Sequence, residues 1–158
     1  MHETDSPLDA ARRRHLAPVD LEATYQYSQP VMPTRVVDGD TYEVVRAPTG
    51  DGLRLTDVRL LGVDTHEIHG GVSHDSEEYK RGIEEKRYVQ EWFRSHLPDG
   101  QTVGPSIDIH RIGEWPLELL THGVRDSFGR LLADVVDVDG TRLSESLFAT
   151  FDDITYTE

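Results

Sequence analysis

The sequence contains no cysteine, which excludes disulfide bonds and thiolate metal sites. It also has only two lysines, Lys80 and Lys86, so arginine supplies the remaining positive side chains. No apolar run approaches the roughly 20 residues that a membrane-spanning helix needs. The arginine run at 12–14 is followed by His15-Leu16-Ala17-Pro18 rather than by an apolar core, so no export signal is predicted. We therefore expect a cytoplasmic protein without membrane contact.

The charge balance is strongly one-sided. There are 30 acidic residues against 16 lysines and arginines, and the net charge is -14. Nucleic-acid-binding proteins usually carry a basic surface, so this charge taken alone argues against such a partner. An acidic, lysine-poor surface is also what a protein of a salty cytoplasm needs, because the Debye length falls to ~3 Å at 1 M salt. We favour this halophilic interpretation, under which only the charge near the site reports on the substrate.

The chain length and a hydrophobic content of 36% suit a single domain with a real core. Residues 1–23 are polar and acid-rich and are expected to form an arm, either a short helix or a disordered segment. The domain proper is predicted at 24–158. Alternating apolar residues predict a meander of three strands at 25–37, with a break at Pro30 and Pro33, at 41–46 and at 53–63.

The second half mixes helical and strand patterns. Ser76 is a predicted cap for an amphipathic helix that Pro98 stops. Further predictions are a strand within 101–110, a long loop to Asp126, a strand at 130–138 and a helix at 142–151. Five strands with a helix between the third and the fourth predict an α+β fold, a small barrel of the OB type with two or three helices. Spacing alone leaves an α+β sandwich as the alternative.

Three segments gather charged residues at the ends of these strands: Arg35–Thr41, Val58–Glu67 and Asp126–Arg130. Phosphodiester hydrolysis needs a cation beside the phosphate, a base for water and donors for the transition-state charge. The three segments contain suitable residues for all of these, so the sequence predicts a metal-assisted phosphodiester hydrolase. The Asp38-Gly39-Asp40 turn alone would be an ordinary hairpin turn.

In this order, the three segments resemble the staphylococcal nuclease (thermonuclease) family over residues 33–151. The resemblance implies an OB-fold barrel that hydrolyses DNA or RNA with calcium. By position, Asp40 and Asp64 would hold the calcium ion with their carboxylates, and Thr65 would hold it with its backbone carbonyl. An oxygen-only set of this kind suits calcium better than zinc.

The resemblance also assigns the catalytic and substrate-binding groups. Glu67 matches the general base, and Arg59 and Arg130 match the two phosphate-binding arginines. Arginine suits this task because its guanidinium group stays charged and forms two parallel hydrogen bonds to a phosphate. Phe128 and Ser127 stand where the best-known members have a tyrosine and a lysine that contact the terminal phosphate. Binding of a 5′ end is therefore expected to be weaker here.

Two further departures concern the frame of the site. His66 stands where the family has a proline before the general base, which is expected to loosen this turn. The residues past 151 are few and acidic, without the family's long final helix, so the barrel is expected to lean on the N-terminal arm, on residues 110–125, or on a second subunit in a dimer. His66, His69 and His74 invite a zinc hypothesis, but a solvated loop is the favoured interpretation because their spacing fits no zinc motif.

The sequence thus predicts a calcium-dependent nuclease that acts on single-stranded or flexible DNA, RNA or both. The main alternative is a non-catalytic OB-type domain that binds nucleic acid and retains a vestigial nuclease site. A weaker alternative is an acidic interaction or inhibitor protein that mimics nucleic acid. The choice between DNA and RNA stays open.

Overall fold

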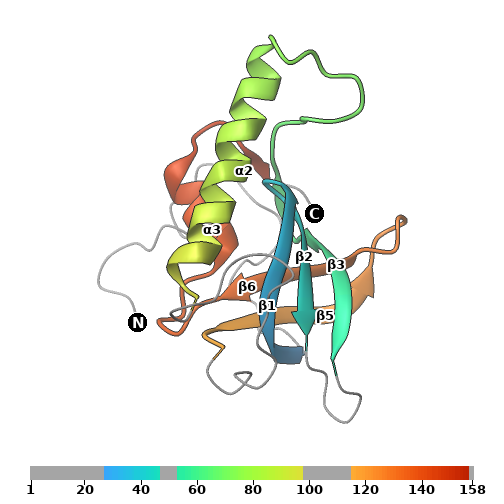
Figure 1. Ribbon diagram of the computed structural model, residues 1–158, viewed down its shortest axis with the longest axis vertical. Coiled ribbons are helices and arrows are strands. Elements are labelled where there is room, and N and C mark those ends of the chain that lie inside the picture. The colour runs from blue at the N-terminus through green and yellow to red at the C-terminus, as the bar shows by residue number, and fades with distance from the viewer. Residues whose placement is uncertain (1–26, 47–52, 98–114, 157–158) are drawn as a thin grey trace.

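The computed structural model describes residues 27–46, 53–97 and 115–156 (Figure 1). The predicted N-terminal arm and the predicted strand within 101–110 lie outside these ranges. The elements follow one another as β1 (Tyr27–Asp38), β2 (Thr41–Arg46), β3 (Arg54–Leu60), β4 (Val63–Asp64), α2 (Glu77–Ser95), β5 (Leu117–Arg125), β6 (Leu131–Val136), α3 (Leu143–Thr150) and β7 (Thr155–Tyr156).

Five of these strands form a closed barrel in the order β1-β2-β3-β6-β5. The neighbours run antiparallel except β3 and β6, which are parallel and pair Val58 with Leu131 and Leu60 with Ala133. This parallel pair closes the barrel, because β6 returns beside β3 after the chain has passed through α2 and β5. The predicted α+β class is confirmed as a closed mixed barrel with two helices in the described ranges.

The predicted meander is confirmed, but its first strand is continuous. β1 runs through Pro30 and Pro33, where the sequence indicated a break. Proline lacks an N–H donor and is tolerated where a strand has a free side or a bulge. Pro30 lies in the part of β1 that pairs with β5, and Pro33 lies at a register shift in the part that pairs with β2. Each proline therefore lies where β1 pairs with a neighbouring strand on one side only, so its missing N–H group can face the unpaired side.

The predicted strand at 53–63 is divided in two. β3 ends at Leu60, and the chain turns at Gly62, whose φ of 83° favours glycine. Val63 and Asp64 then form β4, which pairs with β7 outside the barrel. After β4, Thr65 contacts Asp40 of the β1–β2 turn, and His66 contacts Glu85 of α2.

A long loop was predicted up to Asp126, and this prediction is wrong for residues 117–125, which form β5. Leu117, Leu119 and Thr121 are buried while Glu118 is exposed, an alternation typical of a strand with one face in a core. The strand pairs with both β1 and β6, so it is the barrel strand that lies between them.

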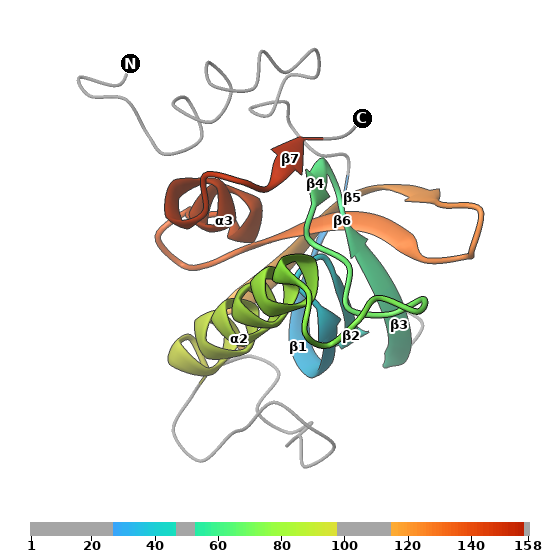
Figure 2. The ribbon, with the colours of Figure 1, turned by 90° about the horizontal axis from the view of Figure 1, so that it is seen from above.

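The two helices pack beside the barrel, α2 against β1 and α3 against β6 (Figures 1 and 2). The side-chain oxygen of Ser76 accepts a hydrogen bond from Tyr79 N at 3.1 Å, so the predicted cap is confirmed. The buried face of α2 includes Val89 and Phe93, and the Phe93 ring meets Tyr42 edge-on with centroids 5.2 Å apart. Full burial of a side chain such as Phe93 contributes about 1.5–3 kcal/mol.

Neither helix in the described ranges is both long and apolar enough to span a membrane.

Candidate functional site

A cavity of about 150 Å³ lies where the β1–β2 turn, β3, the segment after β4 and the β5–β6 turn meet. All six residues predicted for catalysis or metal binding line it, together with three neighbours. The full set is Asp38, Asp40, Thr41, Arg59, Asp64, Thr65, His66, Glu67 and Arg130. Phe128 lies outside this lining and is 83% exposed. Tertiary structure thus gathers residues that are up to 92 positions apart in the chain.

Asp40 is the centre of the acidic side of the cavity. It is buried, and its Oδ2 accepts hydrogen bonds from Thr65 N at 2.8 Å and from Thr65 Oγ1 at 3.0 Å. These bonds join the β1–β2 turn to the segment after β4. Gly39 makes the contact possible, because a Cβ there would lie 2.7 Å from Thr65 Cγ2 and 3.0 Å from Glu85 Cβ. The glycine of the turn is therefore needed for close approach.

Asp38 and Asp40 place two carboxyl groups close together. Burial, a side-chain hydrogen bond to Asp40 and the charge of Asp40 raise the pKa of Asp38 to about 7. Asp38 Oδ1 also accepts a hydrogen bond from Asp40 N at 3.1 Å, which shapes the turn. The pair creates a local excess of negative charge beside the cavity.

Arg59 faces this charge from β3. Its NH1 donates to the carbonyl oxygens of Leu60, at 3.0 Å, and of Val63. The same guanidinium group lies 3.5 Å from carboxylate oxygens of both Asp40 and Asp64. Arg59 is therefore held in place by backbone carbonyls while its positive charge is shared between the two predicted metal-binding aspartates.

Arg130 reaches the cavity from the β5–β6 turn. Its Nε donates to Asp126 Oδ2 at 2.8 Å, and its NH1 donates to Thr41 Oγ1 at 3.3 Å. Asp126 Oδ1 also accepts from the backbone N–H groups of Phe128 and Arg130. These bonds outweigh partial desolvation and hold the pKa of Asp126 below its ordinary value. The Phe128 ring covers the guanidinium group with its centroid 5.3 Å from Arg130 Cζ.

Glu67 lies at the exposed rim of the cavity. Its Oε1 accepts hydrogen bonds from His69 N at 2.7 Å and Ile68 N at 3.0 Å, so the carboxylate closes a tight turn of its own segment. Its Oε2 has no donor among the described residues. One oxygen of the carboxylate is thus fixed, and the other is open to water.

The turn before Glu67 is anchored on α2 by Glu85, a residue that sequence reasoning missed. The fully buried Glu85 carboxylate accepts from His66 N at 2.8 Å and lies 2.8 Å from His66 Nδ1. Burial raises the pKa of Glu85 above its ordinary value, although the bonds from His66 oppose this shift. Glu85 stands four positions before the core residue Val89, so an acid on the apolar stripe of the helix was the available signal.

The histidines of this segment do not share one environment. His66 is partly buried beside Glu85, so the prediction of a solvated loop is wrong for this residue. His69 and His74 are exposed as predicted, and the His74 ring stacks on Tyr79. His66, Glu85 and Asp153 place possible metal-ligand atoms within 4.8 Å of one another. These acids already have protein partners, however, because Glu85 binds His66 Nδ1 and Asp153 binds Arg81.

The donor chemistry of the cavity fits a hard cation better than a soft one. Within the described ranges its lining offers carboxylates of Asp38, Asp40 and Asp64, threonine oxygens and the Glu67 carboxylate, with one imidazole at the edge. The mutual repulsion of Asp38 and Asp40 is relieved by a positive charge. Calcium takes oxygen ligands of these kinds in flexible geometries, so the residues present fit the predicted ion.

No family model matches the chain, and the comparison with curated proteins finds no relative.

Proposed function

We propose that the protein is a calcium-dependent nuclease of the thermonuclease type. The observation that carries this proposal is the convergence of Asp40, Asp64, Arg59, Glu67 and Arg130 on one cavity. These residues come from three separate segments of the sequence. Unrelated surface residues would not be expected to meet in a cavity of about 150 Å³.

The barrel topology supports the same proposal. We infer that the barrel is of the OB type, because its closed five-stranded order has β3 parallel to the last barrel strand and a helix between the third and fourth barrel strands. OB-type barrels often bind oligonucleotides, although a fold alone does not establish an activity.

In the proposed reaction, Glu67 takes a proton from a water molecule while the oxygen of that water attacks the phosphorus atom. The opposite P–O bond breaks, and the leaving oxygen receives a proton from solvent. Arg59 and Arg130 donate hydrogen bonds to the non-bridging phosphate oxygens, whose charge rises in the transition state. Both arginines are pre-positioned by protein acceptors, which lowers the reorganisation that the reaction needs.

Asp40, Asp64 and Thr65 would hold the calcium ion, which would neutralise charge on the phosphate when bound. Thr65 is oriented for this role by its two hydrogen bonds to Asp40. Asp64 is about half exposed and lies close to Arg59, so it is free to adjust when a cation and a phosphate enter.

The net charge of -14 is compatible with this substrate in a high-salt cytoplasm. Salt screens the repulsion between the acidic surface and a polyanion, whereas charges inside a partly buried site are screened much less. The arginine pair then determines the local attraction to phosphate.

The direct test is degradation of denatured DNA and of unstructured RNA by the purified protein in molar KCl with calcium. Chelation should abolish cleavage, and added calcium should restore it. Undiminished cleavage in excess chelator would reject the calcium assignment. Tight binding of single strands without cleavage under any divalent metal would favour the alternative, an OB-type binding domain with a vestigial site.

A further inference from the structure

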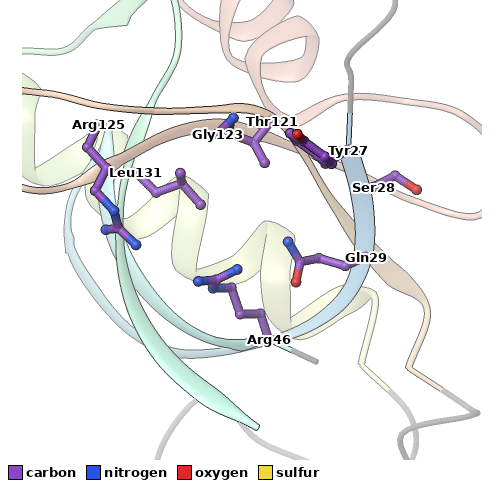
Figure 3. A pocket seen from close by; sticks show the side chains of 8 residues that line it. All are labelled: Tyr27, Ser28, Gln29, Arg46, Thr121, Gly123, Arg125 and Leu131. Carbon is purple, nitrogen blue, oxygen red and sulfur yellow. Dashed lines mark hydrogen bonds between the residues drawn. The ribbon is translucent and has the colours of Figure 1, made fainter. Parts of the chain in front are cut away.

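A second and larger cavity, of about 380 Å³, lies inside the barrel wall between β1, β2, β5 and β6. Figure 3 looks into this cavity with α2 behind it. Its volume falls in the range of small-molecule sites, ~300–1,000 Å³. None of the residues that line it belongs to the lining of the candidate nuclease site.

The polar groups in this cavity are suited to a negatively charged ligand. Arg46 from the end of β2 and Arg125 from the end of β5 point their guanidinium groups into it (Figure 3). Arg46 Nε donates to Thr56 Oγ1 at 2.7 Å, and Arg125 NH1 donates to Gly129 O at 2.9 Å, so both side chains are held at the wall. None of the described residues that line the cavity is acidic, although the chain has a net charge of -14.

Gln29 adds an independent sign that a ligand belongs here. Its side chain points into the cavity from β1, and its Oε1 is buried without a hydrogen-bond donor from any described residue (Figure 3). Buried polar atoms without a partner are rare in folded proteins. A ligand that carries an N–H or amino group would satisfy this oxygen.

The rest of the lining offers an apolar surface for a ring. Leu131 is buried at the start of β6, and Tyr27 is about half exposed at the start of β1. The Tyr27 ring lies across Gly123, where an added Cβ would be 3.3 Å from Tyr27 Cε2. Aromatic rings of this kind stack on nucleobases of any sequence.

We propose that this cavity binds one nucleotide unit, with its phosphate at Arg46 and Arg125 and its base between Tyr27 and the Gln29 amide. The unit is either a free nucleotide or one residue of a longer strand, since both present the same groups. Arg130 and Leu131 are consecutive but line different cavities, so the start of β6 separates this site from the nuclease site. The proposal does not require the nuclease activity.

The test measures equilibrium binding of adenosine 5′-monophosphate, inorganic phosphate and oligothymidylates of increasing length, in chelator so that no strand is cut. Arg125→Gln and Gln29→Leu should each weaken binding of the monophosphate at least about tenfold, because a charged or buried hydrogen bond is lost. Arg94→Gln is the control, because Arg94 is an exposed arginine of α2 that lines neither cavity, and it should leave this binding unchanged. Gln29→Leu should also raise the melting temperature or leave it unchanged, since it removes a buried oxygen without a partner.

Oligothymidylate binding that also depends on Arg125 would identify the unit as part of a strand, and dependence of the monophosphate alone would identify a free nucleotide. Equal affinity for inorganic phosphate and for the monophosphate would overturn the base contact. Binding that is insensitive to both Arg125→Gln and Gln29→Leu would overturn the site. If the wild-type protein binds the monophosphate but cleaves no nucleic acid in the calcium assay, the nuclease proposal is rejected and the proposal for this cavity stands.

Discussion

His66 binds the buried carboxylate of Glu85 through both its backbone N–H and its ring Nδ1, each at 2.8 Å. Gly82, one turn earlier in α2, leaves room for this contact, since a Cβ there would lie 2.7 Å from the His66 carbonyl oxygen. A histidine in place of a proline was expected to loosen the turn before Glu67. The bonds to Glu85 hold that turn against α2 by another route.

Glu85→Ala should therefore lower kcat more than it raises KM, because it releases the turn that positions Glu67. Misplacement of a catalytic group by ~1 Å can cost ~10²-fold in rate. The variant should also lose about 1–3 kcal/mol of unfolding free energy, because the His66 N–H is left without its acceptor. Glu85→Gln is the matched control and should retain most activity, because its amide can still accept from His66 N and donate to the ring. Equal activity of Glu85→Ala and wild type would remove the positioning role.

Asp40→Asn should weaken calcium binding strongly, since it removes a charge from a buried predicted ligand. Asp38→Asn is the neighbouring control and should have a smaller effect. An asparagine there can still accept the hydrogen bond from Asp40 N that shapes the turn. Calcium titration by calorimetry compares the two variants. A larger loss for Asp38→Asn would exchange their roles.

Glu67→Gln and Arg130→Ala should each reduce turnover by at least about two orders of magnitude. Loss of a general base costs ~10²–10⁴ in rate, and loss of one transition-state donor costs ~10²–10³. Glu67→Gln should melt near the wild-type temperature, because the glutamine oxygen can still accept from Ile68 and His69 N–H. Single-turnover kinetics with calcium and denatured DNA measure the effect. Wild-type rates in both variants would place the active site elsewhere.

Stability and activity should rise from dilute buffer toward molar KCl, because salt screens both the self-repulsion of the acidic surface and its repulsion of a polyanion. A variant with the exposed α2 residues Glu77, Glu84 and Glu91 changed to glutamine should reach its maximum at lower salt. Thermal melting and initial cleavage rates along a KCl series provide the comparison. A steady decrease of both with salt would contradict the halophilic interpretation.

Asp134 gives a pH dependence that can be measured away from the nuclease site. This buried residue of β6 accepts hydrogen bonds from Val135 N at 2.8 Å, from Ser144 N at 3.2 Å and from Ser144 Oγ, so it anchors the first turn of α3. Burial raises the pKa of Asp134 above its ordinary value. Its contribution to stability is then complete below the unfolded pKa, near 3.8, and is lost as the pH rises through the raised folded pKa.

Asp134→Asn should therefore be more stable than wild type at neutral pH, and this difference should shrink as the pH falls. Asparagine keeps the acceptor for both N–H groups and can donate to Ser144 Oγ. Asp134→Ala, which leaves these donors without a partner, should be destabilised by at least about 1–3 kcal/mol at all pH values. Urea unfolding of the three proteins between pH 4 and pH 8 tests the sign. If wild type were instead more stable than Asp134→Asn, by a margin that grows with pH, the expected sign would be wrong.

The local sequence was sufficient for the elements whose signals are close together in the chain. The meander of β1, β2 and β3, the helix that Ser76 caps and the short α3 were all predicted, because side-chain periodicity and capping act over a few residues. Charged residues at the ends of these elements also identified the candidate site, since their types and order are properties of the chain itself.

Other features depended on contacts between distant segments. The sequence predicts a loop where β5 lies, because the alternation of this segment becomes meaningful only when β1 and β6 pair on its two sides. The parallel pair of β3 and β6, which closes the barrel, has no local signature at all.

The sequence shows Glu85 only as an acid on the apolar stripe of a helix, whereas its contact with His66 and the cavity at Gln29 depend on which side chains meet at a buried surface. The sequence by itself determined which chemical groups this protein has and which short elements carry them. Only the tertiary structure decided which of these groups share a cavity, because packing over long chain separations sets those distances.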